Sequence, residues 1–462
     1  MNPLPDPREQ ILLGLLAGGP QKAADLTRAL GVSQPTLSRI VRSLGTQVIK
    51  LGAARGTLHA RPRRIAEEIR WPLYRITPDA KIESCGEVIA LMGIPSCWHR
   101  SPWADQDYSD GLPFFIQDLR PQGFMGKHIP ATVPELGLPP RIQDWTDDHV
   151  LRYLVLHGHD AVGDLVLGNR SLQALQVQRA QDHAEQVRVA ADAREKEFER
   201  LATAAIGGLP AGSSAGGEQP KFSANVEGVG WTLVKFSPPD DGESSHRWRD
   251  LLLAEFHALA TLNRHGVRAA QAALIDGPER RFLQVTRFDR HADYGRSSLI
   301  SLGALNNEFV GMVDSWTNTA AALAEKKLIA AEEVERVRLI ETVAMLIGNS
   351  DRHNGNLSFS ATYAASPQFP FALAPCYDML PMHYAPPAAA ETRPYTPLAV
   401  AAPGPEGPEI WLEAANIAVE FWNRVGADPR ATDAFRAVSS QNATNIEKYR
   451  SMTLGSWSAA AR

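Results

Sequence analysis

The stretch Leu346–Ser360, LIGNSDRHNGNLSFS, decides how the rest of this chain is interpreted. Its Asp351 and Asn356 stand five residues apart, in the D-x-x-x-x-N spacing of kinase catalytic loops. A carboxylate at the first position can orient an acceptor hydroxyl and take its proton. An amide oxygen at the second position is a hard ligand for a metal that bridges nucleotide phosphates. Because the same spacing also occurs in ordinary surface turns, the interpretation needs further support.

Three other residues supply that support, each on a suitable predicted element. Lys235 lies in the strand-like segment WTLVKF, and Glu255 lies in the helical segment RDLLLAEFHALATLNRHGV. A lysine there can hold phosphates, and a glutamate can position the lysine. Asp378, in LAPCYDML, follows an apolar run and is expected to be a metal ligand together with Asn356. The order Lys, Glu, Asp…Asn, Asp therefore predicts ATP and Mg²⁺ as cofactors.

The segments GNSDRHNGNLS, LAPCYDML, QVTRFDR and SSAGGEQPKF together resemble the motifs of HipA-family serine/threonine kinases, the toxins of bacterial toxin–antitoxin modules. The resemblance runs from about Gly111 to the C-terminus, and the layout is most similar to the YjjJ subgroup. It implies a two-lobed, protein-kinase-like α+β fold that transfers the ATP γ-phosphate to a serine or threonine hydroxyl. It also implies a toxin whose protein substrate is a component of translation.

The resemblance assigns a phosphate loop upstream of Lys235. A glycine-containing loop that ends in lysine, here with Gly216, Gly217 and Lys221, is expected beside the phosphates. Its glycines would let backbone N–H groups approach closely. Ser213 or Ser214 is the expected site of autophosphorylation. The same residues would also suit a plain serine- and glycine-rich linker.

The resemblance also assigns the adenine pocket and one more catalytic-loop residue. The expected adenine contacts, made chiefly through the backbone of the hinge, are Gln284, Val285, Thr286, Arg287 and Phe288. Thr286 stands where a glutamate is usual in the family, and Asn306–Phe309 departs from the usual E-D-x-x-Q segment. His353 is expected to orient the catalytic loop.

Residues 1–75 predict a winged helix-turn-helix domain. Helices are expected over Arg8–Leu16, Ala23–Leu30 and Gln34–Leu44, followed by two strands over Gln47–Leu51 and Thr57–Ala60. The side chains expected to reach duplex DNA are those of Gln34, Thr36, Ser38, Arg39, Arg42 and, at the tip of the wing, Arg55. The alternative is a helical protein-interaction domain with a solvated polar face.

The remaining chain is expected to form the two kinase lobes. Residues 76–285 would be the N-terminal lobe, and residues 286–462 a C-terminal helical lobe that carries the catalytic loop. Ser171–Ala205 has no glycine or proline and predicts a long solvated helix inserted in the first lobe. A coiled-coil partner helix is the alternative for this segment.

Composition sets the class of protein. A length of 462 residues suggests two or three domains, and 44% hydrophobic with 21% charged residues is typical of a soluble globular protein. The net charge of −5 argues against wholesale non-specific binding of nucleic acid. The three cysteines are not spaced as metal ligands and favour a reducing cytosol. No leader pattern and no membrane-spanning apolar run is evident, so a cytoplasmic protein without a membrane partner is expected.

Two other functions remain open from the sequence. The chain could be a transcriptional regulator whose kinase-like domain only senses nucleotide, although the complete Lys, Asp, Asn, Asp set argues against this. It could also be a small-molecule or lipid kinase, because the same catalytic loop serves those acceptors. The expected macromolecular partners are a protein substrate, duplex DNA, and either an antitoxin or a second copy of the chain.

Overall fold

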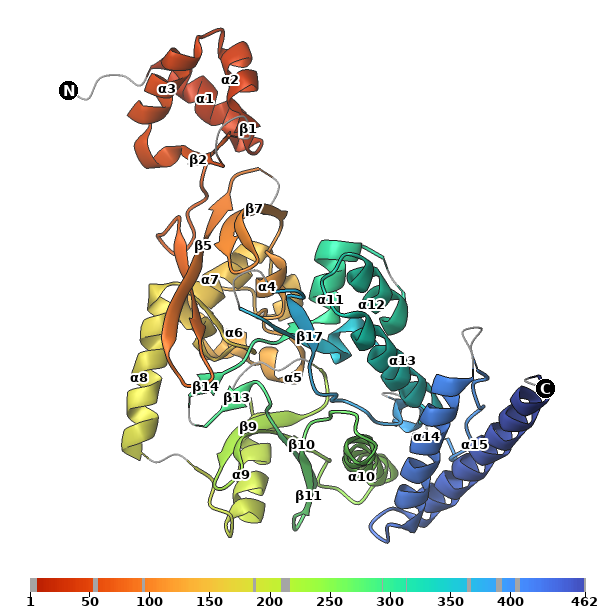
Figure 1. Cartoon of the computed structure of the whole chain (residues 1–462). Coiled ribbons are helices and arrows are strands. Elements are labelled where there is room, and N and C mark those ends of the chain that lie inside the picture. The colour runs from red at the N-terminus through yellow and green to blue at the C-terminus, as the bar shows by residue number, and fades with distance from the viewer. Residues whose placement is uncertain are drawn as a thin grey trace.

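The structure is a computed structural model (Figure 1). It describes residues 6–52, 57–93, 96–185, 188–208, 217–292, 294–312, 314–363, 367–387, 393–403 and 408–460. Four residues that the sequence singles out, Arg55, Ser213, Ser214 and Gly216, lie outside the described residues. Within the described ranges, no helix has both the length and the apolar character needed to cross a bilayer.

The N-terminal unit contains three short helices and a small antiparallel sheet of order β1-β3-β2. Its elements are α1 (Pro7–Ala17), β1 (Gln21–Lys22), α2 (Ala23–Leu30), α3 (Gln34–Ser43), β2 (Ile49–Leu51) and β3 (Leu58–Ala60). The helices and the last two strands lie close to their predicted positions, and the two-residue strand β1 is an addition. Leu12, Leu26, Leu37 and Ile40 are buried where the helices meet. The apolar faces of the three helices therefore form one continuous core.

A five-stranded antiparallel sheet of order β7-β6-β5-β4-β8 follows (Figure 1). Its strands are β4 (Trp71–Ile76), β5 (Ile82–Leu91), β6 (Ser96–Ser101), β7 (Ala104–Asp110) and β8 (Leu165–Leu167). The helices between β7 and β8 are α4 (Phe114–Gln117), α5 (Gly123–Gly126), α6 (Ile129–Thr132) and α7 (Asp147–His157). Phe114 and Phe115 are buried in the main core, which joins this sheet to the helices that follow later in the chain.

The N-terminal lobe is built on a four-stranded antiparallel sheet of order β11-β12-β10-β9. Its elements are β9 (Lys221–Val226), β10 (Gly230–Phe236), α10 (Glu243–Arg264), β11 (Ala272–Asp276) and β12 (Arg281–Thr286). Neighbouring residues of β12 face opposite sides: Phe282 belongs to one buried cluster, and Leu283 packs with the leucines of α10 in another. Since Lys235 pairs with Leu283 across the sheet, Lys235 lies on the face that α10 covers.

The segment predicted as one long solvated helix forms two helices, so that prediction was wrong. They are α8 (Asn169–Glu185) and α9 (Arg194–Ile206). Between them, Val189 pairs with the edge of β9: its N–H donates to Asn225 at 2.8 Å, and its carbonyl accepts from Glu227 at 2.9 Å. Phe198 and Ala202 of α9 are fully buried against the sheet. Strand pairing and burial of an aromatic ring thus override the helical propensity of the continuous segment.

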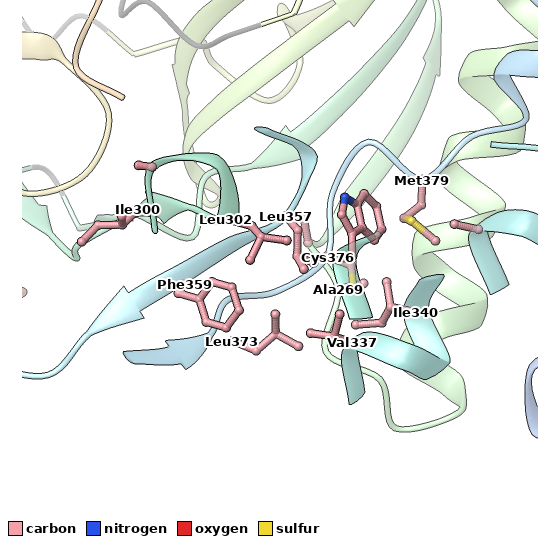
Figure 2. Close-up of a cluster of buried hydrophobic side chains, with 14 of the residues drawn as sticks. Ala269, Ile300, Leu302, Val337, Ile340, Leu357, Phe359, Leu373, Cys376 and Met379 are labelled. Atoms are coloured by element: carbon pink, nitrogen blue, oxygen red, sulfur yellow. The ribbon is translucent and has the colours of Figure 1, made fainter. Parts of the chain in front are cut away.

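The C-terminal lobe is mainly helical. Its helices are α11 (Leu302–Leu305), α12 (Trp316–Glu325), α13 (Ala331–Leu346), α14 (Glu409–Ala427) and α15 (Asp433–Ala460). Short strands join it to the hinge and carry the catalytic loop: β13 (Arg290–His291), β14 (Gly295–Arg296), β15 (Ile300–Ser301), β16 (Ser358–Ala361) and β17 (Phe371–Leu373). Figure 2 shows the core beneath that loop, where Leu357, Phe359 and Leu373 pack with Val337 and Ile340 of α13.

Candidate active site

Three charged groups from distant parts of the chain meet in one cluster. The Nζ of Lys235 on β10 lies 2.7 and 2.8 Å from the two carboxylate oxygens of Glu255 on α10. It also donates to the carboxylate of Asp378, in the segment that follows β17. Lys235 is 3% exposed and Glu255 is 1% exposed. The predicted Lys–Glu–Asp constellation is therefore formed, with one cation shared by two carboxylates.

Burial and charge act against each other in this cluster. Burial alone would lower the pKa of Lys235, but Asp378 and Glu255 raise it above its usual value, so the ammonium is charged. Burial alone would raise the pKa of Asp378, yet Lys235 and Lys221 hold it below its ordinary range. For Glu255 burial prevails over Lys235, and its pKa is raised. Lys235 and Asp378 thus favour each other's charged forms, while burial favours the protonated form of Glu255.

Asn349, which the sequence interpretation did not single out, fixes two of the predicted residues. Its fully buried side chain donates to the carbonyl of Asp378 at 3.2 Å and accepts from the N–H of Asp351 at 3.0 Å. Asp378 itself has a left-handed backbone, with φ of 54°. This conformation is unfavourable for a side-chain-bearing residue and has to be held by its surroundings. The one sequence signal for Asn349 is its position two residues before Asp351.

The catalytic loop is held by bonds to its own backbone. Asn356 donates through its amide nitrogen to the carbonyl of Asp351 at 2.9 Å, which leaves its amide oxygen for another ligand. His353 accepts from the N–H of Gly355 at 3.0 Å, and Trp316 donates to the His353 carbonyl at 3.1 Å. Nε2 of His353 lies 3.9 Å from the Asp351 carboxylate. These contacts match the predicted orienting position of His353.

A cavity of about 690 Å³ lies beside the charged cluster, within the size range of small-molecule sites. The predicted residues that line it are Gly217, Lys221, Lys235, Glu255, Val285, Thr286, Arg287, Phe288, His353, Asn356 and Asp378. Two predicted residues do not line it. Gln284 is 3% exposed, within the sheet between Val234 and Ala273. Asp351 is 54% exposed and faces solvent beyond the cavity wall.

Two backbone donors of the expected adenine hinge are engaged within the protein. The N–H of Thr286 donates to Gln271 at 2.8 Å, and the N–H of Arg287 donates to Trp231 at 2.9 Å. The Arg287 side chain is also engaged, with Nη2 2.7 Å from Asp289. Both N–H groups are therefore used inside the protein, since β12 continues its strand pairing to its end.

A buried ion cluster anchors this hinge to the middle of the chain. Asp289 pairs with Arg287 and, at 2.7 Å, with Arg290, and it accepts from the N–H of Gly163 at 3.0 Å. Burial would raise the pKa of Asp289, but the two arginines hold it far below its usual value. Arg290 donates further to the carbonyl of Ala161 at 2.6 Å. The ion cluster thus holds the hinge against the segment that precedes β8.

The predicted phosphate loop enters the cavity at its C-terminal end. Lys221 is 2% exposed and pairs in register with Lys235 on the neighbouring strand. Burial lowers the pKa of Lys221 to about 8, although Asp378 opposes this. A Cβ on Gly217 would lie 2.8 Å from the Lys221 Nζ, so only glycine leaves room for this approach. Ser213, Ser214 and Gly216 lie outside the described residues.

The middle of the chain supplies a cavity wall that the sequence interpretation missed. Its lining residues are Asp110, Gly111, Leu112, Gln117, Asp118, Arg120, Gln122 and Asp147. Asp118 accepts from both the N–H of Ser301, at 2.6 Å, and its hydroxyl, at 2.7 Å. This ties the wall to the strand that precedes α11. The only sequence signal was the set of polar residues within the otherwise apolar GLPFFIQDLRPQGFMG.

The oxygen donors at the cavity suit a hard cation. Asn356 offers an amide oxygen and Asp378 a carboxylate, and both line the cavity. No cluster of three or more His, Cys, Asp or Glu residues in the described part of the chain forms a self-sufficient metal site. Mg²⁺ is usually held by one or two side chains, with phosphates and water filling the other positions, so these two residues fit it.

Comparison with known proteins places these features in a family. A model described as "YjjJ-like toxin, middle domain" matches residues 67–176, and a "HipA-like C-terminal domain" matches residues 213–446. The chain is 35% identical over 444 residues to Toxin YjjJ of Escherichia coli (strain K12), covering 95% of this chain and 97% of that protein.

One solved structure supports a similar fold. The Shewanella oneidensis MR-1 HipA, determined in a complex with HipB and operator DNA, aligns over 83% of this chain and 97% of its own. That alignment has a TM-score of 0.51 at 14% identity. The Helicobacter pylori proinflammatory kinase CtkA aligns over 52% of this chain and 93% of its own, with a TM-score of 0.38 at 14% identity. This chain belongs to the YjjJ family of toxins, whose C-terminal part is a HipA-like kinase domain.

Proposed function

We propose that this protein is an ATP-dependent serine/threonine protein kinase that acts as a toxin. The observation that carries the proposal is the Lys235–Glu255–Asp378 cluster at a cavity shared with Asn356. In this proposal Lys235 binds the phosphates and Glu255 positions Lys235. Asp378 and Asn356 would hold Mg²⁺, which supplies charge neutralisation for the transferred phosphate.

Nucleotide binding requires one rearrangement of this cluster. Lys235 now donates to both Glu255 and Asp378. With nucleotide bound, Lys235 would turn to the phosphates and Asp378 would serve as a metal ligand, so the Lys235–Asp378 pair would open while the Lys235–Glu255 pair is retained. Lys221, buried beside Lys235, adds a second cation at the phosphates. The gain in phosphate contacts offsets the loss of the Lys235–Asp378 pair.

The acceptor hydroxyl is placed by Asp351. Its carboxylate accepts the hydroxyl proton, the hydroxyl oxygen forms the new bond to the γ-phosphorus, and the bond from that phosphorus to the bridging oxygen of ADP breaks. Because Asp351 is 54% exposed, a side chain presented by a large protein can reach it. This exposure favours a protein acceptor over a lipid or small molecule. A component of translation is the substrate class that the family resemblance suggests.

Autophosphorylation at Ser213 or Ser214 would regulate the kinase. The described end of this loop, at Gly217, lies against Lys221 in the cavity. A phosphoserine a few residues earlier would add about two negative charges near the ATP phosphates. Repulsion would then move the loop outward and lower the affinity for nucleotide.

The N-terminal unit is proposed to be a winged helix-turn-helix that binds duplex DNA. Gln34, Ser38, Arg39 and Arg42 are exposed on α3, and Thr36 is partly exposed. The segment that follows β3 is joined to the middle sheet, because the N–H of Arg63 donates to the carbonyl of Ala90 on β5 at 2.8 Å. Within the proposed layout of residues 1–75, 76–285 and 286–462, this domain would take over the DNA-binding role of a separate antitoxin. An antitoxin or a second copy of the chain remains the proposed protein partner.

Comparative phosphoproteomics tests the kinase assignment. Cells expressing the wild type are compared with cells expressing Asp351→Ala, and Asp241→Ala serves as the control because its side chain is 89% exposed and lies outside the active-site cavity. Phosphoserine or phosphothreonine sites should increase with the wild type and the control and be lost with Asp351→Ala. Identical phosphoproteomes for all three would refute protein phosphorylation and favour a nucleotide-sensing regulator or another acceptor class.

A further inference from the structure

Among the lysine and arginine side chains that line the active-site cavity in the described part of the chain, Arg120 is the one whose ion pair is easiest to exchange. Four lysine and arginine side chains line the cavity within the described residues: Arg120, Lys221, Lys235 and Arg287. Lys235 is shared by two carboxylates, and Arg287 is held in the hinge cluster. Lys221 is buried in the sheet. Arg120 alone comes from the middle of the chain, and its side chain is 35% exposed.

Arg120 lies next to the point where the middle of the chain touches the phosphate loop. Three residues after it, a Cβ on Gly123 would lie 2.4 Å from the carbonyl oxygen of Gly217. The N–H of Phe124 donates to that same carbonyl at 2.9 Å. Gly217 in turn lies close to Lys221, since a Cβ on Gly217 would lie 2.8 Å from the Lys221 Nζ. The segment that carries Arg120 therefore borders the phosphate end of the cavity.

The present partner of Arg120 is replaceable. Its Nη2 lies 2.5 Å from Asp147, which is 27% exposed, and its Nη1 donates to the Trp145 carbonyl at 3.3 Å. A partly exposed pair of this kind contributes little stability. Asp147 is also the first residue of α7, where the positive end of the helix dipole stabilises a carboxylate. Asp147 can thus give up the arginine at small cost, while a phosphate offers the guanidinium two parallel charged hydrogen bonds.

We propose that Arg120 is a phosphate-binding residue: on nucleotide binding its guanidinium leaves Asp147 and binds the phosphates of ATP. The middle domain that characterises this family then completes the nucleotide site instead of serving only as a connector. The inference rests on the proposed ATP-dependent function and adds a specific contact to it. The competing interpretation is that the Arg120–Asp147 ion pair only stabilises the packing of α7 against the cavity wall.

The two interpretations predict different responses to a matched pair of substitutions. Arg120→Gln and Asp147→Asn break the same ion pair, one by removing the cation and the other by releasing it. Binding of ATP and of adenosine to the full-length protein is measured by titration calorimetry at fixed Mg²⁺ for the wild type, both variants and the double variant. Melting temperatures of the four proteins are recorded alongside.

We expect Arg120→Gln to weaken ATP binding by about tenfold to a hundredfold, the value of a charged hydrogen bond, with adenosine binding unchanged. Asp147→Asn should keep or strengthen ATP binding. The double variant should bind ATP as weakly as Arg120→Gln does. Arg120→Lys should recover part of the loss, because it keeps the charge but not the bidentate geometry.

Other outcomes overturn the proposal in distinguishable ways. Equal loss of ATP and adenosine binding in both single variants, with equally lowered melting temperatures, would show that the ion pair has a structural role only. Wild-type ATP affinity in Arg120→Gln would remove the phosphate contact while leaving the kinase assignment intact. Absence of ATP binding by the wild-type protein would overturn the proposed function together with this inference.

Discussion

Replacing Lys235 with methionine should destabilise the protein strongly and in a pH-dependent way. The substitution keeps most of the length of the side chain but removes the cation that two carboxylates share. Glu255 is 1% exposed and has both oxygens within 2.8 Å of the lysine nitrogen, so it would be left buried without its partner. Removing one member of a buried ion pair costs about 3–5 kcal/mol. For a domain of 150–250 residues that corresponds to a melting temperature lowered by roughly 10 °C.

The sign of the pH dependence follows from Glu255. Burial raises its pKa in the folded protein, and without Lys235 nothing of comparable strength opposes this rise. In the variant, the folded state therefore keeps a proton that the unfolded state has lost above pH about 4.5. Stability of Lys235→Met should thus fall as the pH rises from about 5 to 8. The penalty should be smaller at the acid end of this range, because a protonated Glu255 leaves no buried charge.

The assay is thermal unfolding of the full-length protein at pH 5 and pH 8. The matched control is the double variant Lys235→Met, Glu255→Gln, in which Glu255 no longer supplies a buried carboxylate, while Asp378, whose side chain is 24% exposed, keeps its own. This double variant should recover most of the lost stability at pH 8, because replacing both members of a buried pair is nearly neutral. A single variant as stable as the wild type at pH 8, or a double variant less stable than the single one, would refute the charge assignment of this cluster.

Three further predictions concern function. Asp378→Ala should abolish incorporation of labelled phosphate at physiological Mg²⁺, and a rate near that of the wild type would remove it from the proposed metal site. Replacing Arg39 and Arg42 with alanine, with or without Arg55, should weaken duplex binding and flatten its log–log salt dependence by about one per arginine that contacts phosphate. If residues 1–75 bind no duplex in a salt-dependent way, the interaction-module interpretation is correct. Intact mass should reveal a phosphate at Ser213 or Ser214 in the active protein but not in Asp351→Ala, and equal ATP affinity of both forms would refute regulation by loop ejection.

The sequence alone located the parts of the site whose relation is local, such as two residues within one loop or on consecutive elements. Asp351 and Asn356 are joined by a hydrogen bond inside a single turn, so their relation is local. Lys235 and Glu255 lie on a strand and the following helix, and the structure confirms their pairing. Local periodicity also predicted the N-terminal helices: Leu12 and Leu16 of α1 and Leu37 and Ile40 of α3 are buried at helical spacing.

What the sequence could not supply depends on contacts between distant segments. The break between α8 and α9 has no glycine or proline to mark it and arises because Val189 pairs with β9. The hinge N–H groups of Thr286 and Arg287 are occupied because the carbonyls of Gln271 and Trp231, from other segments of the chain, accept from them. The cavity wall formed by the middle of the chain is the clearest case. Arg120 enters the site because Phe124 binds the phosphate loop, more than ninety residues later, and no local pattern encodes such a contact.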